Sequence, residues 1–551
     1  MVEARPTAGA AHTNRRGSFD VSDAAALDDG FSAERLSTGS MSFWFTAYTL
    51  ACSQIGSTLV SVSVFVGGLG IWLGCGVASF LGFAAMLAIY FAQEVWLHAR
   101  RSHLAAVARA SKVEDGVAQV PAQGSPHAGV THVPAGSSSP ARKESGRLMY
   151  GDLVEYTLRM HLTDRTEESR KRIIYWVQVF TVAMQVVSLG GTAVSEVIQT
   201  GVNMFVMTGY QSPRFWAGLM GGAVMTPLTW LPSFESLSWL SLLAILAVIY
   251  TAATIVAEGI VVGVHPDKPI DNPTLVTAFL GLSDMVFIWG GLAMVPEVQS
   301  SMRNPKRLVG AFGVDLVYTL AVLLPTAVVG LWAYQNDVSS NILQQLPNGI
   351  ATKLAAALLS VHMVIAFAVL LNTVMEAAER SCGLRRHAKM DPSDEELQLR
   401  SKPVSGASKA WLQCKRIVLR TAISLFCVFL ALAFPFFSDV VGVISAISQT
   451  YLTFLAPPLM WLTLYQKDAW YGASKARRGS GSLLLPVVDT EADPGHGGVR
   501  YKGGCASRGL IIGAYTMMIV SVVLGLGLGT WASTRALVED VNKWGIFSAN
   551  K

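Results

Sequence analysis

The residues with the clearest capacity for binding chemistry lie between Asp284 and Gln299. This stretch is strongly apolar, yet it contains the glycine pair Gly290–Gly291 and the step Pro296–Glu297. A glycine pair weakens a helix, and proline removes a backbone donor. Inside hydrocarbon, a broken helix is tolerated where the freed backbone groups line a cavity or bind a ligand. The stretch therefore predicts a broken membrane span with a binding site near mid-membrane.

A second group of small and polar residues, Gly56, Ser57 and Thr58, lies within the first long apolar segment. We expect a second helix break at this point. The N-terminus of a half-helix presents free N–H groups and a partial positive charge, which suit a carboxylate. Unwound carbonyl groups would instead suit an amine or a cation. The alternative is an unbroken helix in which the Ser and Thr hydroxyls bond back to the backbone.

Five further side chains near these segments are candidates for binding or for ion coupling. Phe287 and Trp289 flank the predicted break, where they either wall the pocket and contact a cation or pack against other helices. Glu297 and Asp284 are acids within an apolar segment, and such residues are functional candidates by default. Each could equally make a structural hydrogen bond. His362 titrates near physiological pH, which suits a proton relay, but it could also be a structural donor.

Other polar residues bear on the coupling ion. Glu196 and Glu258 fall at the ends of expected spans, so we expect both at the membrane interface. Asn372 and Thr373 could bind a cation, but they come late in their span. The middle of that span, Ile365–Leu371, lacks any hydroxyl. The pattern therefore favours protons over sodium ions.

The composition is that of an all-α integral membrane protein. The chain has 551 residues, 52% of them hydrophobic and 14% charged, whereas an ordinary soluble domain has about 25% charged residues. Its six cysteines do not resemble a disulfide framework or a metal cluster, and we expect no cofactor, metal or nucleic acid partner. A bilayer demands roughly 20 apolar residues per span. We expect eleven spans, at 43–68, 71–97, 174–200, 214–231, 237–263, 274–300, 310–334, 351–378, 416–436, 439–465 and 508–534.

The distribution of Lys and Arg predicts the orientation. These residues concentrate in the loops after the second, eighth and tenth spans, whereas segments 201–213, 335–350 and 437–439 contain none. Because basic loops stay in the cytoplasm, we expect a cytoplasmic N-terminus. An odd number of spans then places the C-terminus outside.

The spans and loops suggest two similar halves. We expect a disordered cytoplasmic tail at 1–42 and disordered or linker loops at 100–148, 380–415 and 466–507. The remaining parts are a first five-helix repeat at 43–263, a second at 274–465 and a last helix at 508–534. Breaks in the first and sixth spans would occupy corresponding places in the two repeats, as in inverted-repeat carriers.

Several motifs, in order along residues 43 to about 465, resemble the amino acid/auxin permease family, in particular its plant lysine/histidine-transporter branch. The segment Phe287–Gln299 looks like the sixth-span motif of this family, aromatic-Gly-Gly followed by Glu-x-Gln, and Gly56–Gly70 aligns with the first-span motif. Further likenesses are Tyr150–Asp152, His362 with Glu376, Phe434–Phe437 and Pro457–Trp461. The chain departs from the family pattern at Thr58, Ser63, Leu292 and Ala293, and the last two positions leave the substrate open.

The resemblance implies a leucine-transporter-type fold and proton-coupled uptake of an amino acid or related amine, with the plasma membrane favoured over the vacuole. The substrate could be a neutral or basic amino acid, a broad set of them, or an indole-type acid. A receptor that keeps the carrier fold without transport stays an alternative. So does a membrane-embedded enzyme, although the chain has no phosphate loop, His-Glu-x-x-His or Gly-x-Ser-x-Gly motif.

Overall fold

The computed structural model describes residues 39–118, 148–162, 165–231, 234–263, 273–384, 406–434, 437–465 and 505–544. The expected N-terminal tail and most of the expected loops lie outside these residues. The loop expected from residue 100 begins later, because α4 continues as a helix to Ala118. Residues 104–118 are rich in alanine, which has the highest helix propensity.

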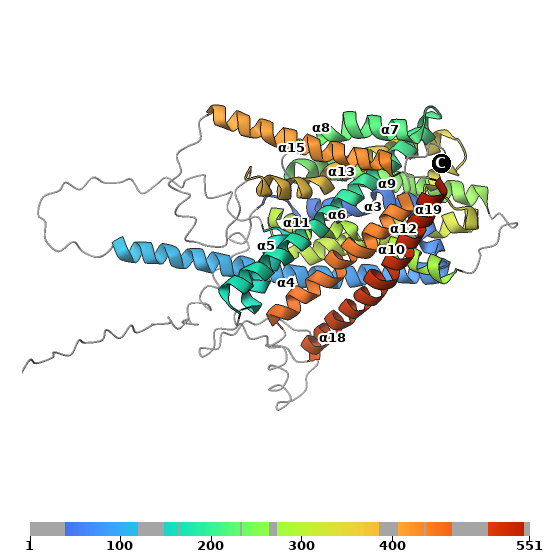
Figure 1. Ribbon diagram of the computed structural model, residues 1–551. Helices are drawn as coiled ribbons and strands as arrows, with labels where there is room; N and C mark the ends of the chain where they lie inside the picture. Colours follow the sequence, from blue (N-terminus) through green and yellow to red (C-terminus); the bar gives the residue numbers. More distant parts are fainter. Residues whose placement is uncertain are drawn as a thin grey trace, which may run out of the picture. The chain divides into compact units, whose positions relative to one another are not determined.

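The described residues form helices, with one isolated bridge between Met41 and Met302 (Figure 1). In chain order the elements are α3 (Phe43–Gly67), α4 (Ile71–Ala118), α5 (Tyr150–His161), α6 (Glu167–Thr208), α7 (Pro213–Met220), η2 (Gly221–Met225), α8 (Thr226–Leu228), α9 (Phe234–Val262), α10 (Leu275–Phe287), η3 (Gly290–Met294), α11 (Val295–Ser301), η4 (Pro305–Arg307), α12 (Leu308–Tyr334), η5 (Gln335–Asp337), η6 (Ile342–Gln344), α13 (Ile350–Ser381), α15 (Gly406–Ala433), α16 (Phe437–Ile444), η7 (Ser445–Leu455), α18 (Cys505–Val520), η8 (Ser521–Gly529) and α19 (Thr530–Trp544).

The chain divides into two compact units. The smaller comprises Met1–Ser32 and Lys467–Leu510, of which the structure describes only residues 505–510, the start of α18. The larger comprises Ala33–Gln466 and Ile511–Lys551.

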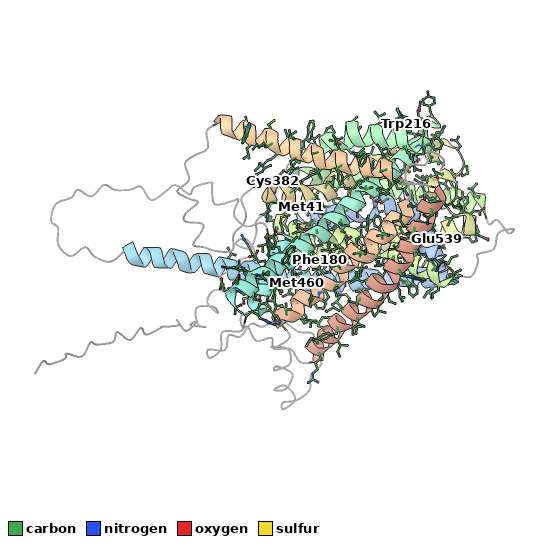
Figure 2. All side chains as sticks on the ribbon, viewed as in Figure 1. Met41, Phe180, Trp216, Cys382, Met460 and Glu539 are labelled. Atoms are coloured by element: carbon green, nitrogen blue, oxygen red, sulfur yellow. The ribbon has the colours of Figure 1, made fainter. Side chains whose placement is uncertain are left out.

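The helices are those of a multi-pass membrane protein. Among the described residues, nine helices are long and apolar enough to cross a bilayer, and the number is ten when the bent pair Leu275–Phe287 and Gly290–Ser301 is counted as one span. The span expected at 214–231 is the shorter run α7–η2–α8. Large apolar side chains face outward, with Trp72 90% and Ile350 87% exposed, and Figure 2 shows such side chains along the outer helix faces. Lipid tails accommodate these side chains, whereas water would not.

Two helices form the centre of the larger unit. In the most apolar stretch of α3, 89% of residues are buried, and for α13 the share is 78%, against 33% for α15. The helix α13 packs against α6 and α9, while α3 packs against α12 and α9. The polar residues of α3 are therefore enclosed by other helices, which is where a membrane protein can keep polar groups.

Candidate functional site

The break predicted in the sixth expected span is confirmed. The helix α10 ends at Phe287, a turn follows, a 3₁₀ segment covers Gly290–Met294, and α11 restarts at Val295. The two helical parts are bent by 40°. Pro296 lies in the first turn of α11, where its missing N–H costs nothing. The local sequence therefore accounts for both the end of one half-helix and the start of the next.

The glycine pair lets two other elements approach the unwound segment closely. A Cβ atom on Gly291 would lie 2.5 Å from Ser53 Oγ of α3 and 2.9 Å from the Ser53 carbonyl oxygen. A Cβ on Gly290 would overlap the side-chain amide of Gln449, which belongs to η7. At Gly291 the contact includes the backbone of α3, so a side chain there would displace that helix, whereas a side chain at Gly290 would displace the end of the flexible Gln449 side chain. Gly290 and Gly291 are buried, as a mid-membrane site needs.

The second predicted break is wrong, because α3 is one continuous helix through Gly56, Ser57 and Thr58. The Thr58 hydroxyl donates to the Gln54 and Ile55 carbonyl oxygens at 2.7 and 2.9 Å, within its own helix. Polar side chains that bond back to the backbone do not interrupt a helix. One glycine without a nearby proline also costs a helix only about 1 kcal/mol, which tertiary packing offsets.

Glu196 is buried beside these residues, which corrects the expectation that it lies at the membrane interface. The helix α6 continues past the expected end at residue 200 to Thr208, where Gly209 caps it in the left-handed conformation. Glu196 is therefore about 18 Å from the end of its helix. Its Oε1 atom accepts hydrogen bonds from the Ser57 N–H at 3.0 Å and the Ser57 hydroxyl at 2.9 Å. Gly56 permits this approach, since a Cβ there would lie 2.5 Å from both carboxylate oxygens.

These contacts connect four elements into one cluster, which we call the site ring. Gln449 Nε2 of η7 donates to the hydroxyl of Thr192 at 3.1 Å, and Thr192 lies one turn before Glu196 on α6. The Thr192 hydroxyl itself donates to the Ser188 carbonyl oxygen at 2.8 Å. The residues of the site ring are Ser53, Gly56, Ser57, Thr192, Glu196, Gly290, Gly291 and Gln449.

The aromatic candidates are buried at the edge of the break. Phe287 is the last residue of α10. The Trp289 ring packs edge-on against Phe312 of α12, with centroids 6.0 Å apart, and a Cβ on Gly82 of α4 would lie 2.7 Å from it. This ring therefore packs between two helices, and substrate contact by Phe287 and Trp289 stays a prediction.

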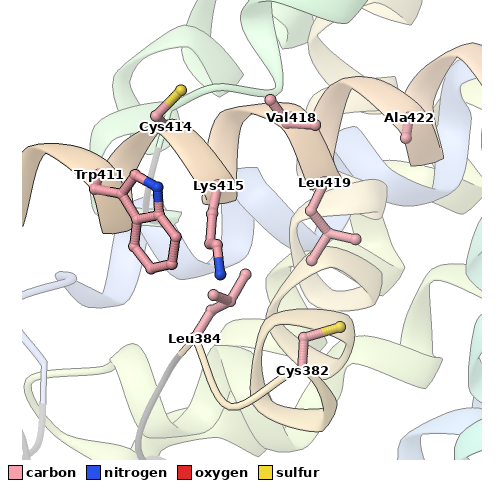
Figure 3. Close-up of a pocket in the computed structure, with 8 residues that line it drawn as sticks. All are labelled: Cys382, Leu384, Trp411, Cys414, Lys415, Val418, Leu419 and Ala422. Carbon is pink, nitrogen blue, oxygen red and sulfur yellow. The ribbon is translucent and has the colours of Figure 1, made fainter.

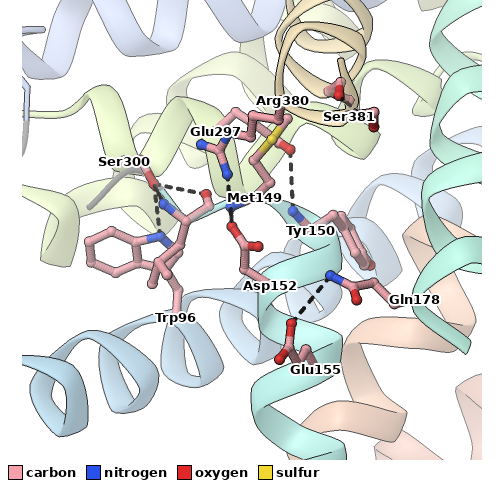
Figure 4. Close-up of polar contacts among 12 residues, drawn as sticks. Trp96, Met149, Tyr150, Asp152, Glu155, Gln178, Glu297, Ser300, Arg380 and Ser381 are labelled. Atoms are coloured by element: carbon pink, nitrogen blue, oxygen red, sulfur yellow. Dashed lines mark hydrogen bonds and ion pairs between the residues drawn. The ribbon is translucent and has the colours of Figure 1, made fainter. Parts of the chain in front are cut away.

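Glu297 links three elements, as Figure 4 shows for its bond to α5. Its Oε1 atom accepts from the Tyr150 N–H at 3.2 Å and from Gln185 Nε2 of α6 at 2.9 Å. The same Gln185 amide donates to the Ala293 carbonyl oxygen of the unwound segment at 2.8 Å. Glu297 thus has the contacts of a structural residue, and its role in ion coupling stays a prediction.

The structure does not bring the other two coupling candidates into the site ring. Asp284 is buried on α10, where a Cβ on Gly442 of α16 would lie 3.0 Å from its Oδ1 atom. His362 is buried on α13, and its Nδ1 atom lies 3.1 Å from the Ala244 carbonyl oxygen of α9. Asp284 and His362 therefore lie outside the site ring, and their role in proton transfer stays a prediction.

Charged and backbone contacts close one end of the bundle, which we call the charged end (Figure 4). Arg380, at the end of α13, forms an ion pair with Asp152 of α5 at 3.0 Å. The helix α5 lies outside the membrane spans, and burial raises the pKa of the Asp152 carboxyl while Arg380 partly offsets this. Ser300 of α11 accepts from Trp96 Nε1 and the Leu148 N–H, both at 3.1 Å.

Two further contacts strengthen the charged end. Arg420 of α15 donates to Glu379 at 2.6 Å, in an ion pair whose side chains are 4% and 2% exposed. Met41, just before α3, donates its N–H to the Ser301 carbonyl oxygen at 3.0 Å and accepts from the Arg303 N–H at 2.9 Å. The entry to α3 is thereby tied to the exit from α11.

Neutral side chains close the opposite end, which we call the amide end. Asn341, in the connection between α12 and α13, donates to Gln199 Oε1 and Asn203 Oδ1 of α6, both at 2.8 Å. The Ser61 hydroxyl of α3 donates to the Ser340 carbonyl oxygen at 2.6 Å. The site ring lies between two closed ends, since Ser53 and Ser57 fall between Met41 and Ser61 along α3.

Sequence reasoning also missed Asp315 of α12. It is buried, and its two carboxylate oxygens accept from Gln54 Nε2 of α3 at 2.8 Å and from the Thr319 hydroxyl at 3.1 Å. A lone acid inside an apolar segment was the signal that could have found it. The carboxylates of Asp315 and Glu196 both contact α3, at residues three apart.

The surface hollow in Figure 3 is separate from this site. It has a volume of about 440 Å³ and lies between the end of α13 and the first half of α15. The Lys415 ammonium lies 3.6 Å from the centre of the Trp411 ring there. None of the residues lining this hollow belongs to the broken span or to the site ring.

Comparison with known sequences decides the family. Residues 136–478, more than half of the chain, match the family described as transmembrane amino acid transporter protein. The chain belongs to this family. The resemblance to amino acid/auxin permeases is thus confirmed, and the family is one of transporters, which decides against a membrane-embedded enzyme.

Similar members of the family are plant proteins. Auxin transporter-like protein 3 of Oryza sativa subsp. japonica is 23% identical over 426 residues, covering 73% of this chain and 70% of the relative. Auxin transporter-like protein 1 of Arabidopsis thaliana is 22% identical over 409 residues, covering 72% and 74%.

Solved structures resemble this amino acid transporter family member more distantly. A Na⁺-coupled sialic acid symporter, in a substrate-bound outward-open state, is 11% identical with a TM-score of 0.40, covering 94% of this chain and 96% of the other. A nucleobase-cation-symport-1 family transporter in a closed conformation is 9% identical with a TM-score of 0.38, covering 94% and 98%. At such scores the family assignment rests on the sequence match.

Proposed function

We propose that this chain carries an amino acid into the cytoplasm together with a proton, by alternating access. The observation that carries the proposal is the broken span α10–α11. Its unwound segment, Gly290–Met294, contacts both α3 and η7, so a ligand held there would touch elements from both halves of the chain. Membership of an amino acid transporter family supports the substrate class.

Closure at both ends of α3 supports alternating access. A carrier must open one end at a time, and each end here is closed by a separate set of hydrogen bonds. Discontinuous helices at the membrane centre let one bundle rock against the rest around a fixed site. Binding energy then closes one end, and the ion gradient sets the direction of the cycle.

The choice of proton over sodium rests on the side chains near the site. The middle of α13, Ile365–Leu371, has no hydroxyl to ligate a sodium ion beside α3. Glu196 and Asp315, in contrast, are buried carboxylates that contact α3 directly. Carboxylates within spans are common in proton relays.

The placement in the cell is part of the same proposal. The distribution of Lys and Arg supports a cytoplasmic N-terminus, and the resemblance to the plant branch supports the plasma membrane. An outside C-terminus requires that Pro213–Leu228 cross the bilayer as an eleventh span.

A second candidate function is transport of an indole-type acid. The observation in its favour is that the similar plant proteins are named auxin transporter-like. A third is a receptor that binds an amino acid without moving it.

Uptake by purified protein in proteoliposomes tests these candidates. A panel of labelled amino acids, with and without an imposed pH gradient, should show accumulation that rises when the outside is more acidic. Binding without accumulation would favour the receptor. Strict dependence on sodium at constant pH would reverse the choice of ion.

A further inference from the structure

The site ring contains two polar atoms that point to the chemistry of its ligand. Among the described residues, Glu196 Oε2 and Gln449 Oε1 are buried and have no hydrogen-bond partner. The side chains of Glu196 and Gln449 are 2% and 0% exposed. Buried polar atoms are almost always hydrogen-bonded in folded proteins, so these two atoms mark a place where a ligand would bind.

Both atoms are acceptors. A carboxylate oxygen can only accept while it is ionised. The orientation of the Gln449 amide follows from its neighbour, because the Thr192 hydroxyl uses its hydrogen on the Ser188 carbonyl oxygen. Thr192 must therefore accept from the NH₂ group of Gln449, which leaves the carbonyl oxygen Oε1 without a donor. A ligand that satisfies both atoms must supply N–H or O–H groups.

The charge of the ligand follows from the surroundings of Glu196. Its carboxylate accepts hydrogen bonds from Ser57 of α3, and the Cys52 thiol is the titratable group of α3 that interacts with it. Among the described residues, no Lys, Arg or His forms a hydrogen bond or ion pair with the Glu196 carboxylate. A buried carboxylate needs a cation or a proton to offset its lost hydration.

We propose that Glu196 is a specificity-determining residue that binds the ammonium group of the substrate, with Gln449 as the second acceptor. This inference rests on the proposed function. It makes the substrate class amino acids and other amines, and it excludes carboxylic acids that lack an amine. The substrate carboxylate does not bind at Ser57, since the carboxylate of Glu196 already takes the Ser57 N–H and hydroxyl.

Glu196 also argues against transport of an indole-type acid, the function that the names of the relatives suggest. An indole-type acid would bring a second carboxylate toward Glu196 and offer no ammonium group in return. Two carboxylates that share a site disfavour each other's charged form, so such a ligand binds poorly. The difference in affinity between an amine and a carboxylic acid that carry the same ring therefore measures the effect of Glu196 on specificity.

The experiment measures the binding of three matched ligands to purified full-length protein: tryptophan, tryptamine and 3-indolepropionate. The wild type should bind the first two at least about tenfold more tightly than the third. Glu196→Gln should weaken binding of tryptophan and tryptamine by about 10- to 100-fold, the usual effect of losing a charged hydrogen bond. Binding of 3-indolepropionate should be unchanged or tighter, because the repelling charge is gone.

Two further variants keep the test sharp. Glu258→Gln makes the same change on α9, at a residue that is not part of the site ring and that interacts with Tyr334, and should bind all three ligands like the wild type. Glu196→Asp keeps the charge, so it should keep the preference for amines even if Glu196→Gln folds poorly. Thermal unfolding of each variant shows whether it is folded.

The outcomes separate this inference from the proposed function. Uptake of amino acids by the wild type, with unchanged tryptophan affinity in Glu196→Gln, would overturn the role of Glu196 and leave the function standing. So would loss of the amine preference in a folded Glu196→Asp. A wild type that binds only 3-indolepropionate would overturn both.

Discussion

The charged end and the amide end of α3 are both closed, but by different interactions. The charged end uses two ion pairs, Asp152–Arg380 and Glu379–Arg420, together with backbone bonds. The amide end uses the neutral groups of Asn341 and its partners on α6. A hydrogen bond to a charged group contributes about 1.5–3 kcal/mol, against about 0.5–1.5 for a neutral one. We therefore expect the amide end to open more easily than the charged end, and of these two ends we expect only the charged end to respond to pH.

The largest expected effect comes from blocking the segment between the two ends. Gly291→Leu should abolish uptake in proteoliposomes while leaving membrane abundance unchanged, because a side chain there collides with Ser53. Gly222→Leu is the control, since a Cβ at Gly222 meets nothing within 4 Å. Uptake at the wild-type rate by Gly291→Leu would count against the site ring as the transport site.

The next effect concerns the stability of the charged end. Arg420→Met removes the ion-pair partner of buried Glu379 and should cost about 3–5 kcal/mol of folding free energy. Thermal unfolding in detergent measures the loss as a lower Tm. Arg535→Met removes an ion pair with Glu539 whose side chains are 54% and 64% exposed, and it should cost at most about 1 kcal/mol. Equal decreases in Tm for the two variants would show that burial does not determine how much each ion pair contributes to stability.

A smaller effect is expected at the amide end. Asn341→Leu leaves Gln199 and Asn203 without their shared donor and should cost about 1–3 kcal/mol. Hydrogen–deuterium exchange should rise in residues 338–345, and exchange in α5 should stay as in the wild type. A rise in both regions would show that the two ends are not closed independently.

The smallest effect is a pH dependence confined to the charged end. Because burial raises the pKa of Asp152, this carboxyl takes up a proton at a higher pH than an ordinary aspartate. The raised pKa means that the closed charged end binds this proton more tightly than the opened, hydrated end does, so protonation favours the closed state by linkage. Deuterium exchange in α5, corrected for the intrinsic rate, should therefore be lowest at acid pH and should rise as the pH increases and Asp152 ionises. An equal pH dependence of exchange in the Asp152→Asn variant would show that Asp152 is not its origin, since asparagine does not titrate.

The sequence predicted best what depends on neighbouring residues. The break at Gly290–Gly291 follows from a glycine pair and Pro296 within one segment, and nothing from the rest of the chain is needed to explain it. The long apolar helices were predictable for the same reason, because length and hydropathy are local properties.

What the sequence could not predict depends on partners far along the chain. Ser57 and Glu196 are 139 residues apart, so their hydrogen bond leaves no local signal. The sequence predicts Glu196 at a span end, because it gives no sign that the apolar segment 201–208 extends α6 instead of forming the following loop. The polar cluster at Gly56–Thr58 suggested a break, yet its groups are satisfied by Gln54, Ile55 and Glu196 without any unwinding.

The bridge between Met41 and the end of α11 has a consequence for sequence variation. Its two hydrogen bonds join main-chain atoms only, so the side chain at position 41 takes no part in them. The Met41 side chain is buried, so another apolar residue of similar size could replace it and both hydrogen bonds would persist. Proline would break the bridge, because it has no hydrogen to give to the Ser301 oxygen.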